Sequence, residues 1–243
     1  NNLSDAGSST INLVGFRLSG TKADKEHPFG HGRFEYIAGL IVSMAILLMG
    51  FELGKTSIDK IIHPETVTFS YLAVAVLIVS ILTKLYMFFY NRGIGKKIDS
   101  SAMRATAMDS FSDVAATSTV LLSMLIGKWT GLKIDGYSGL LVALFICYTG
   151  IRAAKETVSP LLGQSPTKEF VEKIQNIVLE QDGVIGVHDL VVHDYGPGRR
   201  MISLHAEVPA DGNLILLHDA VDNLEKLLRN ECGCEAVIHM DPV

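Results

Sequence analysis

The sequence predicts an α-helical membrane bundle in residues 1–163 and a small α+β domain in residues 164–243. Hydrophobic residues make up 48% of the 243-residue chain and charged residues only 19%, against roughly 25% charged in soluble proteins. Residues 1–163 hold 15 Lys/Arg and 12 Asp/Glu, whereas residues 164–243 hold 6 and 14. A mildly basic, apolar part is therefore followed by an acidic part with a net charge of −8.

Five apolar segments predict the membrane helices. Their charge-free cores fall short of the roughly 20 residues of a simple spanning helix. Each core is extended by flanks whose few charges can snorkel or face inward. A soluble all-α core is the competing interpretation, but the short polar links favour the membrane. The segments are residues 1–18, 34–62, 66–91, 102–127 and 136–162.

The links between these segments predict the orientation. Counted together with the helix ends beside them, the links after the first and third segments hold four Lys/Arg each, and the other two links hold two each. By the positive-inside rule the richer links are cytoplasmic, and so is the domain after the last helix. The first segment then enters from outside. We expect one further helix before Asn1, six in the full-length protein, and a chain that is part of a longer one.

The acidic part has the predicted order αββαβ, a small sheet with helices on one face. Ser165 and Pro166 predict the N-cap and first residue of a helix that continues to Val178. Strands are expected at residues 186–192, 200–208 and 236–240, with a helix at 214–229. In the second strand, one face carries Ile202, Leu204, Ala206 and Val208, and the other carries Ser203, His205 and Glu207.

Two pairs of polar residues lie inside apolar stretches, and the members of each pair are four positions apart. The pairs are Asn1 with Asp5 and Asp109 with Asp113. Because four residues is about one helical turn, each pair lies on one helix face. A carboxylate at membrane depth is costly unless it faces a partner, a cavity or an ion. Three carboxylates and an amide on two facing helices predict a divalent-cation site, with helix caps or loop residues as the alternative.

A second cluster lies in the link after the first segment, which is predicted to be cytoplasmic. Asp24, His27 and His31 offer one carboxylate and two imidazoles, a common ligand set for zinc. Pro28 and Gly30 interrupt any helix between the histidines, so these need not follow helical spacing. Solvated loop histidines are the alternative.

The acidic domain contains a third cluster: His188, His205, His218, His239 and Asp241. His239 and Asp241 are two residues apart and share one strand face, and His205 is on the polar face of its strand. The cluster predicts a further metal site, with scattered surface histidines as the alternative.

The three cysteines do not predict a disulfide framework, and a reducing compartment is expected. Cys147 lies in an apolar stretch and is interpreted as a core residue. Cys232 and Cys234 form a C-x-C motif, which is interpreted mainly as part of a turn.

The motifs NLSDAGSS, HPFGHGRFEY, DSFSD and IHMDP together resemble those of the cation diffusion facilitator family of metal/proton exchangers. The resemblance spans nearly the whole chain, from the family's second transmembrane helix. It implies a six-helix, cell-membrane transporter with a metallochaperone-like cytoplasmic domain, working as a homodimer. By motif match, the resemblance implies a transport site at Asn1, Asp5, Asp109 and Asp113. It implies a loop site at Asp24, His27 and His31. It also implies a cytoplasmic dimer-interface site at His188, His205, His218, His239 and Asp241.

Two positions depart from the family pattern. Zinc transporters of the family generally have a histidine in one transport-site pair, whereas this chain has only oxygen ligands there. Oxygen ligation suits Mn²⁺ and imidazole favours Zn²⁺, so the site resembles that of the family's manganese exporters, with Zn²⁺ and Fe²⁺ left open. Some members also pair a basic residue at the place of Arg33 with an acidic one near the end of the last helix, where this chain has Gly163.

The resulting interpretation is a secondary transporter that exports a divalent metal, with Mn²⁺ favoured, in exchange for protons. Its partners are a second copy and the lipid bilayer, and nucleic acid is not expected. A membrane-anchored metal sensor or storage protein is the rival from another class. An enzyme is not expected, because the sequence contains no H-E-x-x-H and no nucleophile–base pair stands out.

Overall fold

The computed structural model describes residues 2–64, 70–130 and 134–243. Contacts divide the chain into two compact units. The first joins Asn1–Leu18 to Phe34–Val158, and the second joins Ser19–Arg33 to Ser159–Val243. The link after the first helix therefore groups with the C-terminal part of the chain.

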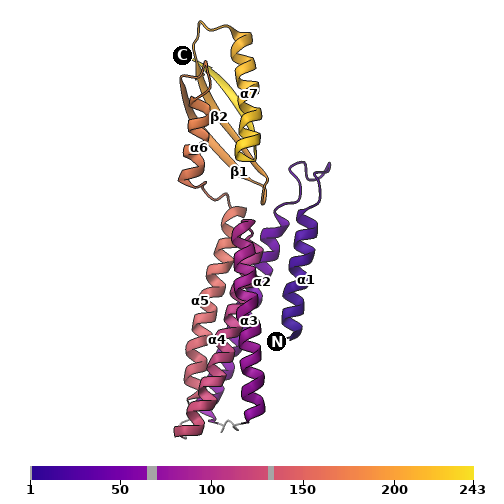
Figure 1. Cartoon of the computed structure of the whole chain (residues 1–243), viewed down its shortest axis with the longest axis vertical. Coiled ribbons are helices and arrows are strands. Elements are labelled where there is room, and N and C mark those ends of the chain that lie inside the picture. Colours follow the sequence, from indigo (N-terminus) through magenta and orange to yellow (C-terminus); the bar gives the residue numbers. More distant parts are fainter. Residues whose placement is uncertain (1, 65–69, 131–133) are drawn as a thin grey trace. The chain divides into compact units, whose positions relative to one another are not determined.

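The first unit is helical, as the apolar segments predict (Figure 1). Within the described residues, four helices are long and apolar enough to cross a membrane, namely α2 to α5. Residues 66–69 of the third predicted segment lie outside the described part. The helices are α1 (Asn2–Ser19), α2 (Phe34–Ile62), α3 (Tyr71–Lys97), α4 (Ser101–Thr130) and α5 (Asp135–Leu161).

The interior of this unit is lined by small and branched side chains, while large apolar side chains face outward. The buried cluster joins α2, α4 and α5 through Val42, Ile46, Ala105 and Ile146. On the outside, Leu48, Leu72 and Val79 are more than 60% exposed. An apolar outer surface on a helical bundle suits lipid, in which each helix satisfies its own backbone groups.

The second unit contains a three-stranded sheet in the order β1-β2-β3. Its strands are β1 (Gly186–Asp194), β2 (Arg200–Val208) and β3 (Cys234–Pro242). β1 pairs antiparallel with β2, and β3 pairs parallel with it, so α7 (Leu214–Cys232) forms the crossover. β1 and β3 extend beyond their predicted ends because β2 offers partners along its whole length.

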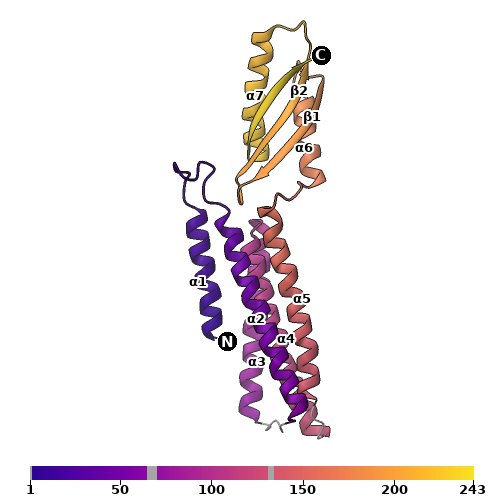
Figure 2. The same ribbon diagram turned by 180° about the vertical axis from the view of Figure 1, so that it is seen from behind.

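Both helices of the C-terminal part pack on the same face of this sheet, which confirms the αββαβ prediction (Figure 2). Along β2, Ile202, Leu204, Ala206 and Val208 are buried and alternate with half-buried residues, as expected. The core combines these residues with Ile174, Val178, Leu224 and Leu228 from the helices. The opposite face of the sheet carries polar side chains, among them His188, His205 and His239, together with exposed valines at positions 191 and 237.

The predicted start of the first of these helices is wrong by two residues. α6 spans Lys168–Leu179, and its N-cap is Thr167, whose side chain accepts a hydrogen bond from the backbone N–H of Phe170. The extended conformation that proline favours in Ser165 would also suit an N-cap, so local preference alone does not decide between the two positions. Thr167 is the next residue that can cap the helix.

The loop of residues 19–33 packs on the turn between β1 and β2. Arg33 donates hydrogen bonds from Nε and Nη2 to the carbonyl oxygen of Asp194, at 3.1 and 2.8 Å. The same guanidinium lies 4.8 Å from the ring centre of Tyr195, which also stacks on Phe29. Arg33 therefore has a partner in the β1–β2 turn, although Gly163 offers it no carboxylate.

Candidate metal sites

Asp109 and Asp113 lie on the interior face of α4, as their spacing predicts. Their exposed fractions are 8% and 4%. The same stretch of α4 buries the small residues Ala105, Ser110 and Ser112, which allow neighbouring helices to approach closely. Two carboxylates inside an apolar bundle require a compensating charge or ion.

Of the partner pair, position 5 belongs to α1, which contacts α4 through a hydrogen bond from Asn12 Nδ2 to Thr106 Oγ1. α1 and α4 run in opposite directions (Figure 1). Asp5 precedes Asn12 by as many residues as Asp113 follows Thr106, so about 10 Å of helix rise brings backbone positions 5 and 113 to the same depth. Asn1 and the side chain of Asp5 lie outside the described residues, and their role as ligands stays a prediction.

The structure adds a residue that the sequence reasoning missed. Lys84 Nζ lies 2.6 Å from Asp113 Oδ2, with exposed fractions of 12% and 5% for the two side chains. Lys84 is the middle residue of α3. Its sequence signal is a single charge in the otherwise uncharged stretch from Tyr71 to Asn91.

Asp24, His27 and His31 come together in the loop of the second unit. Each offers one ligand atom, and these atoms lie within 4.8 Å of one another. The Asp24 carboxylate accepts hydrogen bonds from the backbone N–H groups of His27 and Glu26. These bonds, with that of His27 first, hold the pKa of Asp24 below its usual value. Gly30, at φ +80°, makes the turn that returns the chain to His31.

The polar face of the sheet carries a row of three histidines. In the strand register, His188 is opposite His205, and His205 is opposite His239. The ring centres of adjacent pairs are 5.1 and 4.8 Å apart. Asp241 Oδ2 lies 3.3 Å from His205 Nδ1 and 3.2 Å from His188 Nε2. We refer to His188, His205, His239 and Asp241 as the histidine row.

The Asp241 carboxylate is suited to ligation because it is ionised at neutral pH. Its hydrogen bond with His205, followed by the charges of His205 and His188, lowers its pKa below the usual value, although burial opposes this shift. Asp189, which the sequence reasoning missed, joins His188 and His205 in a second group of potential ligands. It has a positive φ of 51° at an irregularity between His188 and Val191 that the sequence pattern does not reveal.

His218 is not brought to the histidine row within one chain. It lies on α7, which packs on the other sheet face, and its Nδ1 is 3.9 Å from Asp222 Oδ1. Its side chain is 63% exposed. A role for His218 in the cytoplasmic site therefore requires a second copy and stays a prediction.

The C-x-C motif does not have the properties of a metal site. Cys234 is 2% exposed and belongs to the core of the second unit. Burial raises the pKa of its thiol to about 11 and also raises that of Cys232. Thiolates are the metal-binding form, so these thiols are poorly suited to ligation.

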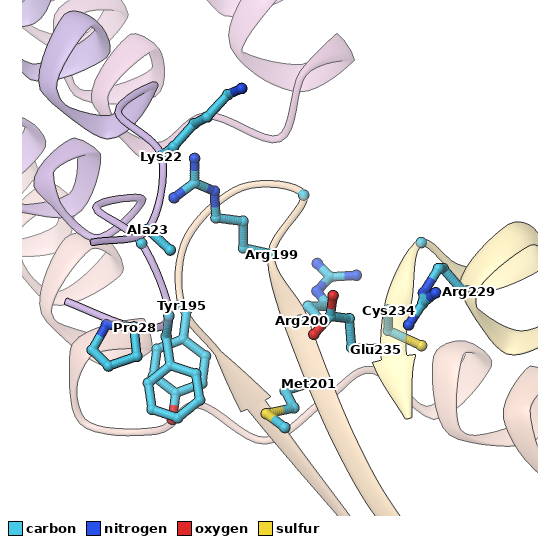
Figure 3. A pocket seen from close by; sticks show the side chains of 14 residues that line it. Lys22, Ala23, Pro28, Tyr195, Arg199, Arg200, Met201, Arg229, Cys234 and Glu235 are labelled. Atoms are coloured by element: carbon cyan, nitrogen blue, oxygen red, sulfur yellow. The ribbon is translucent and has the colours of Figure 1, made fainter. Parts of the chain in front are cut away.

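A cavity of about 490 Å³ in the second unit is also unsuited to a cation (Figure 3). Basic side chains dominate its charged lining, opposed by Glu235. They are Lys22, Arg199, Arg200 and Arg229. Such a lining repels metal ions.

Comparisons with known proteins match both parts of the chain. Residues 1–162 match the model of the cation efflux transmembrane domain, and residues 166–243 match that of the cation efflux protein cytoplasmic domain. An uncharacterized transporter of Methanocaldococcus jannaschii is 34% identical over 99% of this chain and 85% of its own length. The cation-efflux pump FieF of Escherichia coli is 32% identical over 99% of this chain and 80% of its own length.

Two solved structures are of CzrB, described as a candidate zinc transporter, one of them in a zinc form. They are 29% and 30% identical, with TM-scores of 0.31 and 0.30. Both cover 32% of this chain, and the matches extend over 99% and 90% of the CzrB chains. On the two domain models and the full-length relatives, this chain belongs to the cation diffusion facilitator family of cation efflux transporters.

Proposed function

We propose that this protein exports a divalent metal ion, with Mn²⁺ as the favoured substrate, in exchange for protons. The observation that carries the proposal is the pair Asp109 and Asp113, buried on one face of α4 inside a bundle with an apolar outer surface. Carboxylates in such a place are typical of ion pathways and proton relays.

The choice of metal depends on ligand chemistry. The proposed transport ligands Asn1, Asp5, Asp109 and Asp113 all offer oxygen, which suits Mn²⁺ better than it suits Zn²⁺. Zn²⁺ and Fe²⁺ remain alternatives, because oxygen sites also bind Zn²⁺ and geometry must then exclude it. CzrB is described as a zinc transporter candidate, which keeps Zn²⁺ the principal competitor.

Exchange follows from competition for the same oxygens. The carboxylates bind metal when ionised and protons when the metal has left, so each ion displaces the other. Inward- and outward-facing states then alternate around a site that stays near the midplane.

The nitrogen-containing clusters have a different role in this proposal. Asp24, His27 and His31 form a loop site, and the histidine row with His218 forms a site between two copies of the cytoplasmic domain. Metal there neutralises part of the −8 charge of residues 164–243 and so favours a homodimer. We place the domain boundary at 163/164 and the protein in the cell membrane.

Metal flux into proteoliposomes tests the proposal. The intact protein should carry Mn²⁺ with an opposing proton flux, and Asp109→Ala should abolish both while the protein stays folded and dimeric. Asp59→Ala is the matched control, because Asp59 is 75% exposed at the end of α2. Near-normal flux by folded Asp109→Ala protein would contradict the assignment. Metal binding without flux in the parent would favour the sensor or storage alternative.

A further inference from the structure

Lys84 is a largely buried cation at the middle of an apolar helix. As the middle residue of α3, it lies about 20 Å of helix rise from either end. A lysine side chain is too short to carry its ammonium group over that distance to either membrane surface. The charge must therefore be compensated inside the bundle, and the side chain is only 12% exposed.

Its compensating group is a residue of the proposed transport site. Lys84 Nζ lies 2.6 Å from Asp113 Oδ2, a distance typical of a charge-assisted hydrogen bond. α3 thus contributes to a site that the motifs assign to α1 and α4 alone.

The formal charges of the site balance when Lys84 is counted. Asp5, Asp109 and Asp113 carry three negative charges, and a divalent ion supplies two positive ones. Without Lys84 the loaded site would keep one uncompensated negative charge at membrane depth, which is costly. With Lys84 the loaded site is neutral.

We propose that Lys84 acts as a tethered counter-cation that limits how tightly the carboxylate site holds its metal ion. It shares Asp113 with the substrate and repels it, so the bound ion can leave in each cycle. Lys84 thus affects metal binding through Asp113 and does not bind the metal itself. This role rests on the proposed transport function.

Three variants separate charge from packing. Lys84→Gln removes the charge, and Lys84→Arg keeps it. Lys55→Gln is the control, since Lys55 is an exposed lysine of α2. The flux assay should show that Lys84→Gln lowers both KM for Mn²⁺ and maximal rate by about tenfold or more, because a nearby positive charge has been lost. Lys84→Arg and Lys55→Gln should stay close to the parent in both parameters.

Folding of Lys84→Gln gives a second readout. The variant removes the Lys84 ammonium group from beside Asp113, and added Mn²⁺ should replace that charge. Its thermal unfolding temperature should therefore rise more with Mn²⁺ than that of the parent. If the variant unfolds in chelator, Mn²⁺ should restore it.

Parent-like KM and rate in Lys84→Gln, or misfolding that Mn²⁺ does not relieve, would overturn the role of Lys84. So would equal losses in Lys84→Gln and Lys84→Arg, because they would indicate packing rather than charge. These outcomes are distinct from failure of the proposed function, in which the parent protein itself carries no metal.

Discussion

Replacing His205 with alanine should weaken metal binding by the cytoplasmic domain more than replacing either neighbouring histidine. His205 lies on the central strand, and it belongs to both groups of potential ligands on this sheet face. His188 and His239 belong to one group each. The substitution therefore removes a ligand from both of these groups.

The magnitude follows from linkage between binding and folding. Free metal at 100 times Kd stabilises the folded domain by about 2.7 kcal/mol. Loss of a supporting residue alone typically weakens metal sites by 10–100-fold, so we take about 100-fold for a ligand. The stabilisation then falls to about 0.4 kcal/mol, which lowers the metal-induced rise in Tm by about 10 °C or more for a domain of this size. The His205 side chain is 38% exposed, so its loss should otherwise change stability little.

Calorimetric unfolding of segment 164–243, with and without Mn²⁺ or Zn²⁺, measures this effect. The segment contains the whole buried core of the second unit, from Ile174 to Cys234, and should fold alone. His193→Ala is the matched control, because His193 lies on the neighbouring strand β1 and pairs with Met201, away from the histidine row. If His205→Ala and His193→Ala reduce the metal effect equally, or if metal leaves the parent unchanged, the histidine row does not bind metal.

The pH dependence of the metal-induced rise in Tm shows whether imidazole or carboxylate ligands hold the metal. The pKa of Asp241 is lowered in the folded domain, so its contribution to stability is complete above the ordinary value of 3.8 and is lost as the pH falls through the lower folded value. Asp241 thus stays ionised at pH 5. The metal-induced rise in Tm should nevertheless fade between pH 7 and pH 5, because protons compete for imidazole in this range. An effect that persists to pH 5 would point to a carboxylate site instead.

Two other outcomes are expected. Asp109→His or Asn1→His adds an imidazole and should shift flux from Mn²⁺ towards Zn²⁺ in competition assays, and a parent that already carries Zn²⁺ far better would refute the metal assignment. His239→Ala combined with Asp241→Ala should weaken the metal-dependent association of segment 164–243 in small-angle scattering at neutral pH, and unchanged association would leave this domain a passive dimerisation unit.

The elements of this fold were largely predictable because their signals are local. Apolar length predicts α2 to α5, and the alternation along β2 predicts which side chains are buried. The start of α6 differs from the prediction because Ser165 and Thr167 are both residue types that cap helices, and only the folded structure shows that Thr167 makes the cap hydrogen bond. Strand ends were also missed, since they depend on the partner strand rather than on the strand's own sequence.

The sequence predicts which residues are candidate ligands, but not which of them lie next to one another in the fold. Sequence spacing places His239 and Asp241 on one strand face, but the pairing of three strands aligns His188, His205 and His239 in one row. His218 is separate from this row, because it lies on α7, which packs against the other face of the sheet. Register between strands is a property of the folded sheet, so residue spacing along one strand cannot reveal it.

Lys84 illustrates the same limit inside the bundle. The sequence shows Lys84 only as a single charged residue in an apolar segment. It does not show that the ammonium group lies beside a buried carboxylate, where it changes the charge of the site. The pair with Asp113 forms because α3 packs directly on α4. A transport site described only by its oxygen ligands would carry a net charge of −1 when loaded with a divalent ion, and Lys84 removes that charge. Selectivity in this site therefore has to be analysed with four charged side chains, one of which repels the substrate.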